Sequence, residues 1–165
     1  MGIMRVMNVA VGTAAIVTAL LAAPGSASAA EQHQARPMSG IPVITWQNKH
    51  TGLCLYHDNL REVSQSGCNA NDEHVQWIDD QDTSGDFTES AVSNGGPDPY
   101  ACLNDDGNGT VNLSCLSGRH LTWSEIHTSS GWVLQNQDTE MCLTVVGYWG
   151  VIDAPCDGSD TQLWG

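Results

Sequence analysis

Six cysteines carry the most specific chemical signal in the sequence. They fall in three close couples, 14, 13 and 14 positions apart: Cys54 and Cys68, Cys102 and Cys115, Cys142 and Cys156. An even number of cysteines in an exported chain is typical of disulfide bonds, and six cysteines allow 15 pairings. The close couples favour one disulfide within each couple. The alternative is a metal site, but there is no C-x-x-C motif and the histidines do not fall at zinc-ligand spacing.

The other residues that could do chemistry form no recognisable catalytic set. The six histidines are scattered without an H-E-x-x-H motif, and no G-x-S-x-G motif or unpaired cysteine offers a nucleophile. The run Asp105-Asp106-Gly107-Asn108-Gly109 lacks the alternating carboxylates and final Glu of a calcium loop, so a hairpin turn is favoured. Adjacent acids such as Asp79-Asp80 leave a hydrolytic acid–base couple open. We expect no enzymatic activity and no cofactor or metal.

Residues 1–29 have the features of a secretory signal peptide. Arg5 precedes an apolar run from Val9 to Ala23, and Ala27-Ser28-Ala29 fits a small-residue cleavage site. A membrane anchor is the alternative, but the run is shorter than the roughly 20 residues that a span requires. We therefore predict a secreted, extracellular protein with a flexible N-terminal lead-in over residues 30–40.

The chain is strongly acidic, with a formal net charge of −14 that becomes −15 once Arg5 is removed. Without a basic patch a protein gains little by releasing counterions from polyanions. The charge therefore argues against nucleic acid and anionic membranes as partners. A cationic partner remains the alternative to simple solubility outside the cell.

A unit of about 40 to 48 residues occurs three times between residue 41 and residue 165. Each copy begins a cysteine couple with Cys-Leu and places a tryptophan eight or nine positions after the second cysteine, at Trp77, Trp123 and Trp164. Short alternating apolar runs separated by Gly, Asn, Asp, Pro and Ser predict strands, and no window has a helical period. The length suits a single all-β domain of three tandem repeats.

This unit resembles the repeat of the ricin B-type β-trefoil lectins. The residues that carry the resemblance are Trp46-x-Asn48, Thr51-Gly52-x-Cys54-Leu55, Leu134-x-Asn136, Thr139, Cys142-Leu143 and the ending Gln162-Leu163-Trp164. The other two endings, Val75-Gln76-Trp77 and Leu121-Thr122-Trp123, keep only the tryptophan of the family's Q-x-W. The resemblance implies a β-trefoil over residues 41–165, with three repeats around a pseudo-threefold axis and their Trp and Leu residues in a shared core. We expect a monomer with three intra-repeat disulfides.

The resemblance also implies up to one shallow sugar site per repeat, built from a carboxylate, an aromatic ring and an Asn. No repeat keeps the full set. The matching positions are Tyr56, Ser66 and His74 in repeat one, and Thr144, Ala154 and Thr161 in repeat three. Repeat two departs least, with Asn104 followed by Asp105, then Leu113 or Ser114, and His120.

A different contact surface is predicted at Tyr148-Trp149, between Gly147 and Gly150 in an expected hairpin tip. Adjacent exposed aromatics are typical contacts for a sugar face or a protein surface. The alternative is that one ring packs down over the end of the barrel. We predict carbohydrate binding, to a glycan or polysaccharide, by Asn104, Asp105, His120, Tyr148 and Trp149. The alternative function is a protein-binding or inhibitory β-trefoil that has lost sugar binding.

Overall fold

The computed structural model describes residues 36–38, 41–116 and 120–165. The predicted signal peptide, residues 1–29, lies outside the described residues, as does most of the lead-in. Within the described residues the chain is almost entirely β, as predicted. The strands are β1 (Arg36–Met38), β2 (Ile41–Val43), β3 (Cys54–His57), β4 (Val63–Ser66), β5 (Trp77–Gln81), β6 (Phe87–Ser93), β7 (Gly96–Asp105), β8 (Val111–Leu113), β9 (Trp123–Thr128), β10 (Gly131–Asn136), β11 (Met141–Val146) and β12 (Gly150–Pro155). Two 3-10 helices, η1 (Glu73–Val75) and η2 (Asp160–Gln162), complete the elements.

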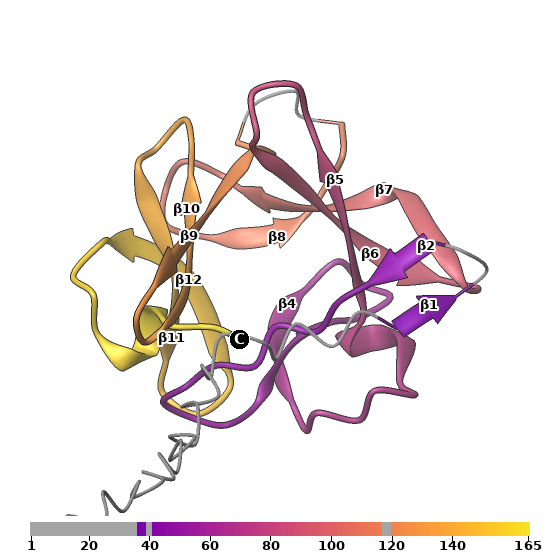
Figure 1. Ribbon diagram of the computed structural model, residues 1–165, viewed down its shortest axis with the longest axis horizontal. Helices are drawn as coiled ribbons and strands as arrows, with labels where there is room; N and C mark the ends of the chain where they lie inside the picture. The colour runs from indigo at the N-terminus through magenta and orange to yellow at the C-terminus, as the bar shows by residue number, and fades with distance from the viewer. Residues whose placement is uncertain (1–35, 39–40, 117–119) are drawn as a thin grey trace, which may run out of the picture.

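The strands pair almost entirely as antiparallel neighbours in one continuous sheet. Its order is β3-β4-β12-β11-β10-β9-β6-β7-β8, with β5 paired to β6, while β1 and β2 form a separate two-stranded sheet. Figure 1 shows the three repeats of residues 41–165 arranged around a common centre. The strand β1 falls inside the range predicted as lead-in and pairs with β2 along Arg36–Met38.

Backbone hydrogen bonds join the last repeat to the first. Gln47 and Gly165 exchange two such bonds, with N–O distances of 2.8 and 3.0 Å, and Trp132 and Trp164 exchange another two at 2.7 and 2.8 Å. An isolated bridge pairs Asn48 with Trp164. The end of the chain therefore lies between the first repeat and β10, which closes the ring of repeats.

One hydrogen bond recurs in each repeat and positions a tryptophan in the core. The buried indoles of Trp77, Trp123 and Trp164 each donate Nε1–H to the carbonyl of the leucine that follows the repeat's first cysteine. The N–O distances are 3.2, 3.0 and 3.1 Å for the carbonyls of Leu55, Leu103 and Leu143. The three leucines are themselves buried. This repetition confirms that the repeat Trp and Leu residues point into one shared core.

Each repeat also carries its own disulfide. The bonds are Cys54–Cys68, Cys102–Cys115 and Cys142–Cys156, with Cα–Cα distances of 5.0, 4.8 and 5.1 Å. The pairing and the all-β threefold architecture predicted from the sequence are both confirmed. Each bond closes a short loop between the first and last parts of a hairpin, so it restrains a repeat rather than linking two repeats.

Candidate functional site

The turn between β11 and β12 presents two aromatic rings to solvent. Tyr148 is 59% exposed and Trp149 56%. Their ring centroids lie 4.6 Å apart with the planes at 89°. Gly147 has φ +61°, and a side chain at Gly150 would meet Val146 at 2.9 Å, so the two glycines allow this tight tip. The predicted exposure of the tip is confirmed, and the alternative in which a ring packs down does not hold.

The backbone of this tip is held by a residue from repeat one. Gln65, on β4, donates its backbone N–H to the Trp149 carbonyl at 3.0 Å and its side-chain amide to the Tyr148 carbonyl at 3.3 Å. The Thr51 hydroxyl in turn donates to Oε1 of Gln65 at 2.5 Å. The two side chains are exposed, while hydrogen bonds from Gln65 hold the backbone that carries them. A backbone that is already fixed loses less conformational entropy when a ligand binds. The sequence contains no motif that would have revealed Gln65.

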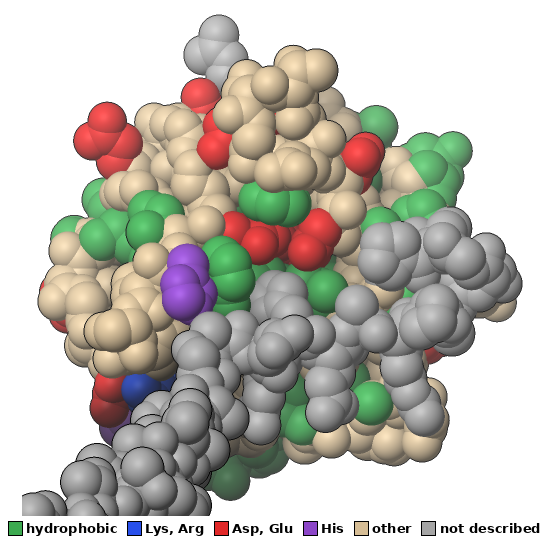
Figure 2. Space-filling view, viewed as in Figure 1, with side chains coloured by type: hydrophobic (Ala, Val, Ile, Leu, Met, Phe, Trp, Pro, Cys, Tyr) green, Lys and Arg blue, Asp and Glu red, His purple; other side chains and the backbone are tan. Residues whose placement is uncertain are grey.

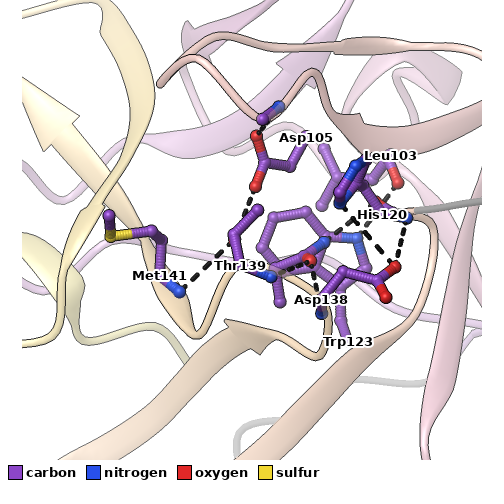
Figure 3. A network of polar contacts seen from close by, with 9 residues as sticks. Leu103, Asp105, His120, Trp123, Asp138, Thr139 and Met141 are labelled. Carbon is purple, nitrogen blue, oxygen red and sulfur yellow. Dashed lines mark hydrogen bonds and ion pairs between the residues drawn. The ribbon is translucent and has the colours of Figure 1, made fainter.

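The repeat-two residues that were predicted to bind sugar form hydrogen bonds within the protein, near the junction with repeat three (Figure 3). Asp105 has no exposed surface, and it accepts hydrogen bonds from the Gly107 N–H at 2.7 Å and the Thr139 hydroxyl at 2.6 Å. Asn104 is 4% exposed and donates to the Asn112 side chain at 3.2 Å. A sugar approaching this region would meet neither group without rearrangement of these bonds.

His120 is partly exposed, unlike Asn104 and Asp105. Its backbone has φ +64°, and its N–H donates to Oδ2 of Asp138 at 2.6 Å. Its carbonyl accepts from the Asn136 amide at 2.9 Å and from the Asp105 N–H at 3.2 Å. Asn104 and Asp105 thus lie at the end of β7 and His120 lies in the segment before β9, whereas Tyr148 and Trp149 belong to the separate β11–β12 hairpin. Their role as sugar-binding residues stays a prediction.

The family positions of repeats one and three are also engaged internally. The Tyr56 ring stacks on His74, with centroids 5.4 Å apart and planes at 26°, and Nδ1 of His74 lies 2.9 Å from Asp72. This hydrogen bond from the imidazole lowers the pKa of the Asp72 carboxyl. In repeat three the buried Thr144 accepts a hydrogen bond from the Gln162 amide at 3.0 Å.

A cleft that the sequence did not reveal lies between repeats one and two. It has a volume of about 240 Å³, and its walls include Arg61, Glu73, His74, Asp98 and the exposed ring of Tyr100. At its base His57 is buried, with Nε2 placed 3.1 Å from the Glu73 carbonyl, and this burial lowers the pKa of the imidazole. The cleft offers one aromatic face and several hydrogen-bonding groups.

Among the described residues, one group of side chains has the geometry to hold a metal ion. It consists of Asp79 on β5, Glu89 on β6 and Glu125 on β9. Within the same residues, no helix has the length and apolar character needed to cross a membrane.

No protein-family model matches the chain, and no curated protein does either. Solved structures do share its architecture. The designed threefold-symmetric protein ThreeFoil aligns with a TM-score of 0.63 and 19% identity over 74% of this chain and 95% of its own. SeviL, solved with asialo-GM1 saccharide bound, aligns with a TM-score of 0.59 and 18% identity over 75% of this chain and 94% of its own. The fold is a β-trefoil.

A third similar structure belongs to a larger protein. The endo-β-galactosidase from Clostridium perfringens that releases GlcNAcα1-4Gal aligns with a TM-score of 0.63 and 18% identity. The alignment covers 74% of this chain but only 31% of that enzyme. The chain thus has a β-trefoil fold that is shared both by proteins aligned over nearly their whole length and by part of a larger chain.

Proposed function

We propose that the protein is a secreted, lectin-like carbohydrate-binding domain without catalytic activity, and that Tyr148 and Trp149 form its principal contact surface. The observation that carries this proposal is the pair of rings, each more than half exposed, on a backbone held by Gln65. Aromatic rings stack on the apolar face of a sugar ring, and this exposed pair offers ring surface for such a contact. Three disulfides are compatible with an extracellular location.

The family-type sugar sites are degenerate in this proposal. The acidic position of repeat two is Asn104, and the neighbouring Asp105 is buried and bonded to Gly107 and Thr139. A neutral acceptor forms hydrogen bonds about half as strong as those of a carboxylate, so sugar binding at these positions would be weak. The domain would therefore rely on stacking more than on charge-assisted hydrogen bonds.

A glycan array on the oxidised protein, read at high protein concentration, tests this function. Binding to a sugar class should be lost in Trp149→Ala and retained in Tyr100→Ala, because Tyr100 is equally exposed but lines the cleft. Binding that Tyr100→Ala abolishes and Trp149→Ala leaves intact would place the sugar in the cleft instead. A folded protein that binds no glycan would contradict the proposal.

The second candidate is a protein-binding or inhibitory β-trefoil. It is favoured by the internal contacts at the family's sugar positions, such as the stack of Tyr56 on His74 and the buried bonds of Asp105. In that case the exposed aromatic tip would contact a protein surface. Under this candidate the array is silent and Trp149→Ala weakens capture of a protein partner while leaving the fold intact.

A further inference from the structure

Three acidic side chains converge on adjacent strands at one face of the barrel. Asp79 on β5 and Glu89 on β6 are paired directly across the two strands, and Glu125 lies on the next strand, β9. One carboxylate oxygen from each lies within 4.8 Å of the other two. Figure 2 shows acidic side chains gathered in the middle of the face where Figure 1 places these strands. We name this group the acidic triad.

Glu89 occupies a core position that an apolar residue fills in the other two repeats. Ala91, Asn136 and Asn48 pair with the repeat tryptophans Trp77, Trp123 and Trp164. Two positions earlier, the corresponding residues are Glu89, Leu134 and Trp46. All three have no exposed surface. A carboxyl group therefore stands where the threefold pattern would place a hydrocarbon side chain, and burying it is expensive unless a partner compensates it.

The protein supplies only part of that compensation. The Trp46 indole donates to Oε2 of Glu89 at 3.2 Å. Oε1 of Glu89 and Oε1 of Glu125 are buried and accept no hydrogen bond. An oxygen of the fully buried Glu89 is thus directed into the triad without a donor.

The pKa shifts of Glu89 and Glu125 are consistent with this incomplete compensation. Burial, followed by the neighbouring Asp79, raises the pKa of Glu89 well above its ordinary value. Burial and Asp79 also raise the pKa of Glu125 to about 7. The buried Oε1 of Glu89, which has no hydrogen-bond donor, can be compensated either by a proton or by a metal ion.

We propose that the acidic triad of Asp79, Glu89 and Glu125 binds a hard divalent cation, with Ca²⁺ as the ion that fits best. Carboxylate oxygens suit Ca²⁺, Mg²⁺ and Mn²⁺ rather than the softer metals that histidine and cysteine select. With Ca²⁺–oxygen distances of about 2.3–2.6 Å, two ligands on opposite sides of the ion lie at most about 5 Å apart. The observed limit of 4.8 Å between the triad oxygens falls within that range.

The surrounding residues suit such a site. The indole of Trp46 holds Oε2 of Glu89, which orients Oε1 toward the other two carboxylates. Asp79 and Glu125 are partly exposed, so an ion could reach the triad and keep some of its water ligands.

Terbium luminescence provides a direct test with the oxidised protein after chelator treatment. Tb³⁺ is an oxygen-seeking probe for Ca²⁺ sites, and the Trp46 indole in contact with Glu89 should sensitise its emission. At pH 8, above the pKa of about 7 for Glu125, we expect a single saturable Tb³⁺ site that Ca²⁺ displaces. Ca²⁺ should also raise the melting temperature in proportion to its occupancy.

Two isosteric variants locate the site. Glu125→Gln, which changes a partly exposed residue, should reduce Ca²⁺ affinity at least tenfold, and Glu89→Gln provides a second test if the first variant folds poorly. Asp80→Asn is the matched control because Asp80 is exposed, adjacent to Asp79 and outside the triad. Failure of Ca²⁺ and Tb³⁺ to bind the folded protein would overturn the proposal, and so would equal losses of affinity in Asp80→Asn and Glu125→Gln.

Discussion

At the scale of single residues, the tryptophans divide into buried donors and exposed rings. Trp123 donates to the Leu103 carbonyl from a fully buried position, whereas Trp149 is 56% exposed. Trp123→Phe should lower the free energy of unfolding by about 1–3 kcal/mol, because the buried backbone carbonyl of Leu103 loses the indole N–H that donates to it. Trp149→Ala should change it by less than about 0.5 kcal/mol. Urea unfolding measures both, and a large loss in Trp149→Ala would show that its ring supports the fold.

A second prediction concerns Asp153 on β12, which faces Asp105 and Asp106. Burial and the hydrogen bond and charge of Asp105 raise the pKa of Asp153 from 3.8 to about 6. The folded state therefore holds this proton more tightly than the unfolded state does. The resulting stabilisation is complete below pH 3.8 and is lost as the pH rises through about 6.

Asp153→Asn tests this pH dependence because Asn cannot ionise but still offers a donor to Asp105. Relative to the parent protein, the variant should gain stability between pH 4 and pH 7. The gain is at most about 3 kcal/mol, since one pKa unit corresponds to about 1.4 kcal/mol. Urea midpoints at pH 4, 5.5 and 7 give the trend. Asp157→Asn provides a contrast, because hydrogen bonds from Ser159 lower the pKa of Asp157, so the contribution of its carboxylate to stability changes below pH 3.8 and the difference from the parent should stay nearly constant between pH 4 and pH 7. A pH-independent difference for Asp153→Asn would contradict the assignment.

Residue types with a single dominant role could be predicted from the sequence, and residues with an unusual environment could not. Cysteine couples and repeat tryptophans have few alternatives to disulfides and a core. Glu89 and Asp153 are acids, and acids are usually placed on the surface, so their burial depends on contacts that only the fold reveals. The same reasoning applies to Asp105, whose position next to a family sugar residue does not show that Gly107 and Thr139 bind it.

At the scale of elements, two equivalent turns carry different residues at the same left-handed position. Asn48 begins one turn and Asn136 the other, and their backbone carbonyls accept the N–H of Gly52 and Glu140 respectively. The φ angles of Gly52 and Glu140 are +68° and +58°. A left-handed conformation costs a non-glycine residue about 1–2 kcal/mol, and glycine avoids that strain.

The two turns therefore predict opposite effects for reciprocal substitutions. Glu140→Gly should be neutral or stabilising by up to about 1 kcal/mol, because relief of strain is partly offset by the greater freedom of glycine in the unfolded chain. Gly52→Glu should be destabilising by about 1–2 kcal/mol, although a Cβ at Gly52 meets no atom within 4 Å. Thermal melts of both variants at one pH measure the pair. Equal losses in both would show that side-chain contacts outweigh backbone strain.

Hairpins were more predictable than the surfaces they form. Short alternating runs predicted strands rather than helices, and the glycines of the 147–150 turn marked an exposed tip. The cleft could not be inferred because its walls come from two repeats, with His74 on one side and Tyr100 on the other. The support of Trp149 by Gln65 also crosses between repeats. Local sequence patterns specify elements, whereas these sites depend on how the elements meet.

At the scale of the whole molecule, the fold repeats while the chemistry does not. The Trp–Leu hydrogen bond and the disulfide recur in all three repeats, because each maintains the shared core or a local hairpin. The acidic triad, the cleft and the aromatic tip each involve residues that have no counterpart of the same type in the other repeats. Threefold repetition could therefore be predicted from the sequence, and the functional surfaces had to be located in the structure.

The closure of the ring by Asn48 gives the last prediction. Its buried amide donates to the carbonyls of Thr161 and Leu163 at 3.0 and 3.2 Å, and Oδ1 accepts the N–H groups of His50 and Thr51. Asn48→Ala leaves several of these groups without partners and should lower the free energy of unfolding by about 3 kcal/mol or more. Because the repeats share one core, calorimetry should show one transition at a lower temperature, as in Asn136→Ala at the next junction. Two separate transitions in Asn48→Ala would mean that the first repeat can detach while the rest stays folded, and that the core is not shared cooperatively.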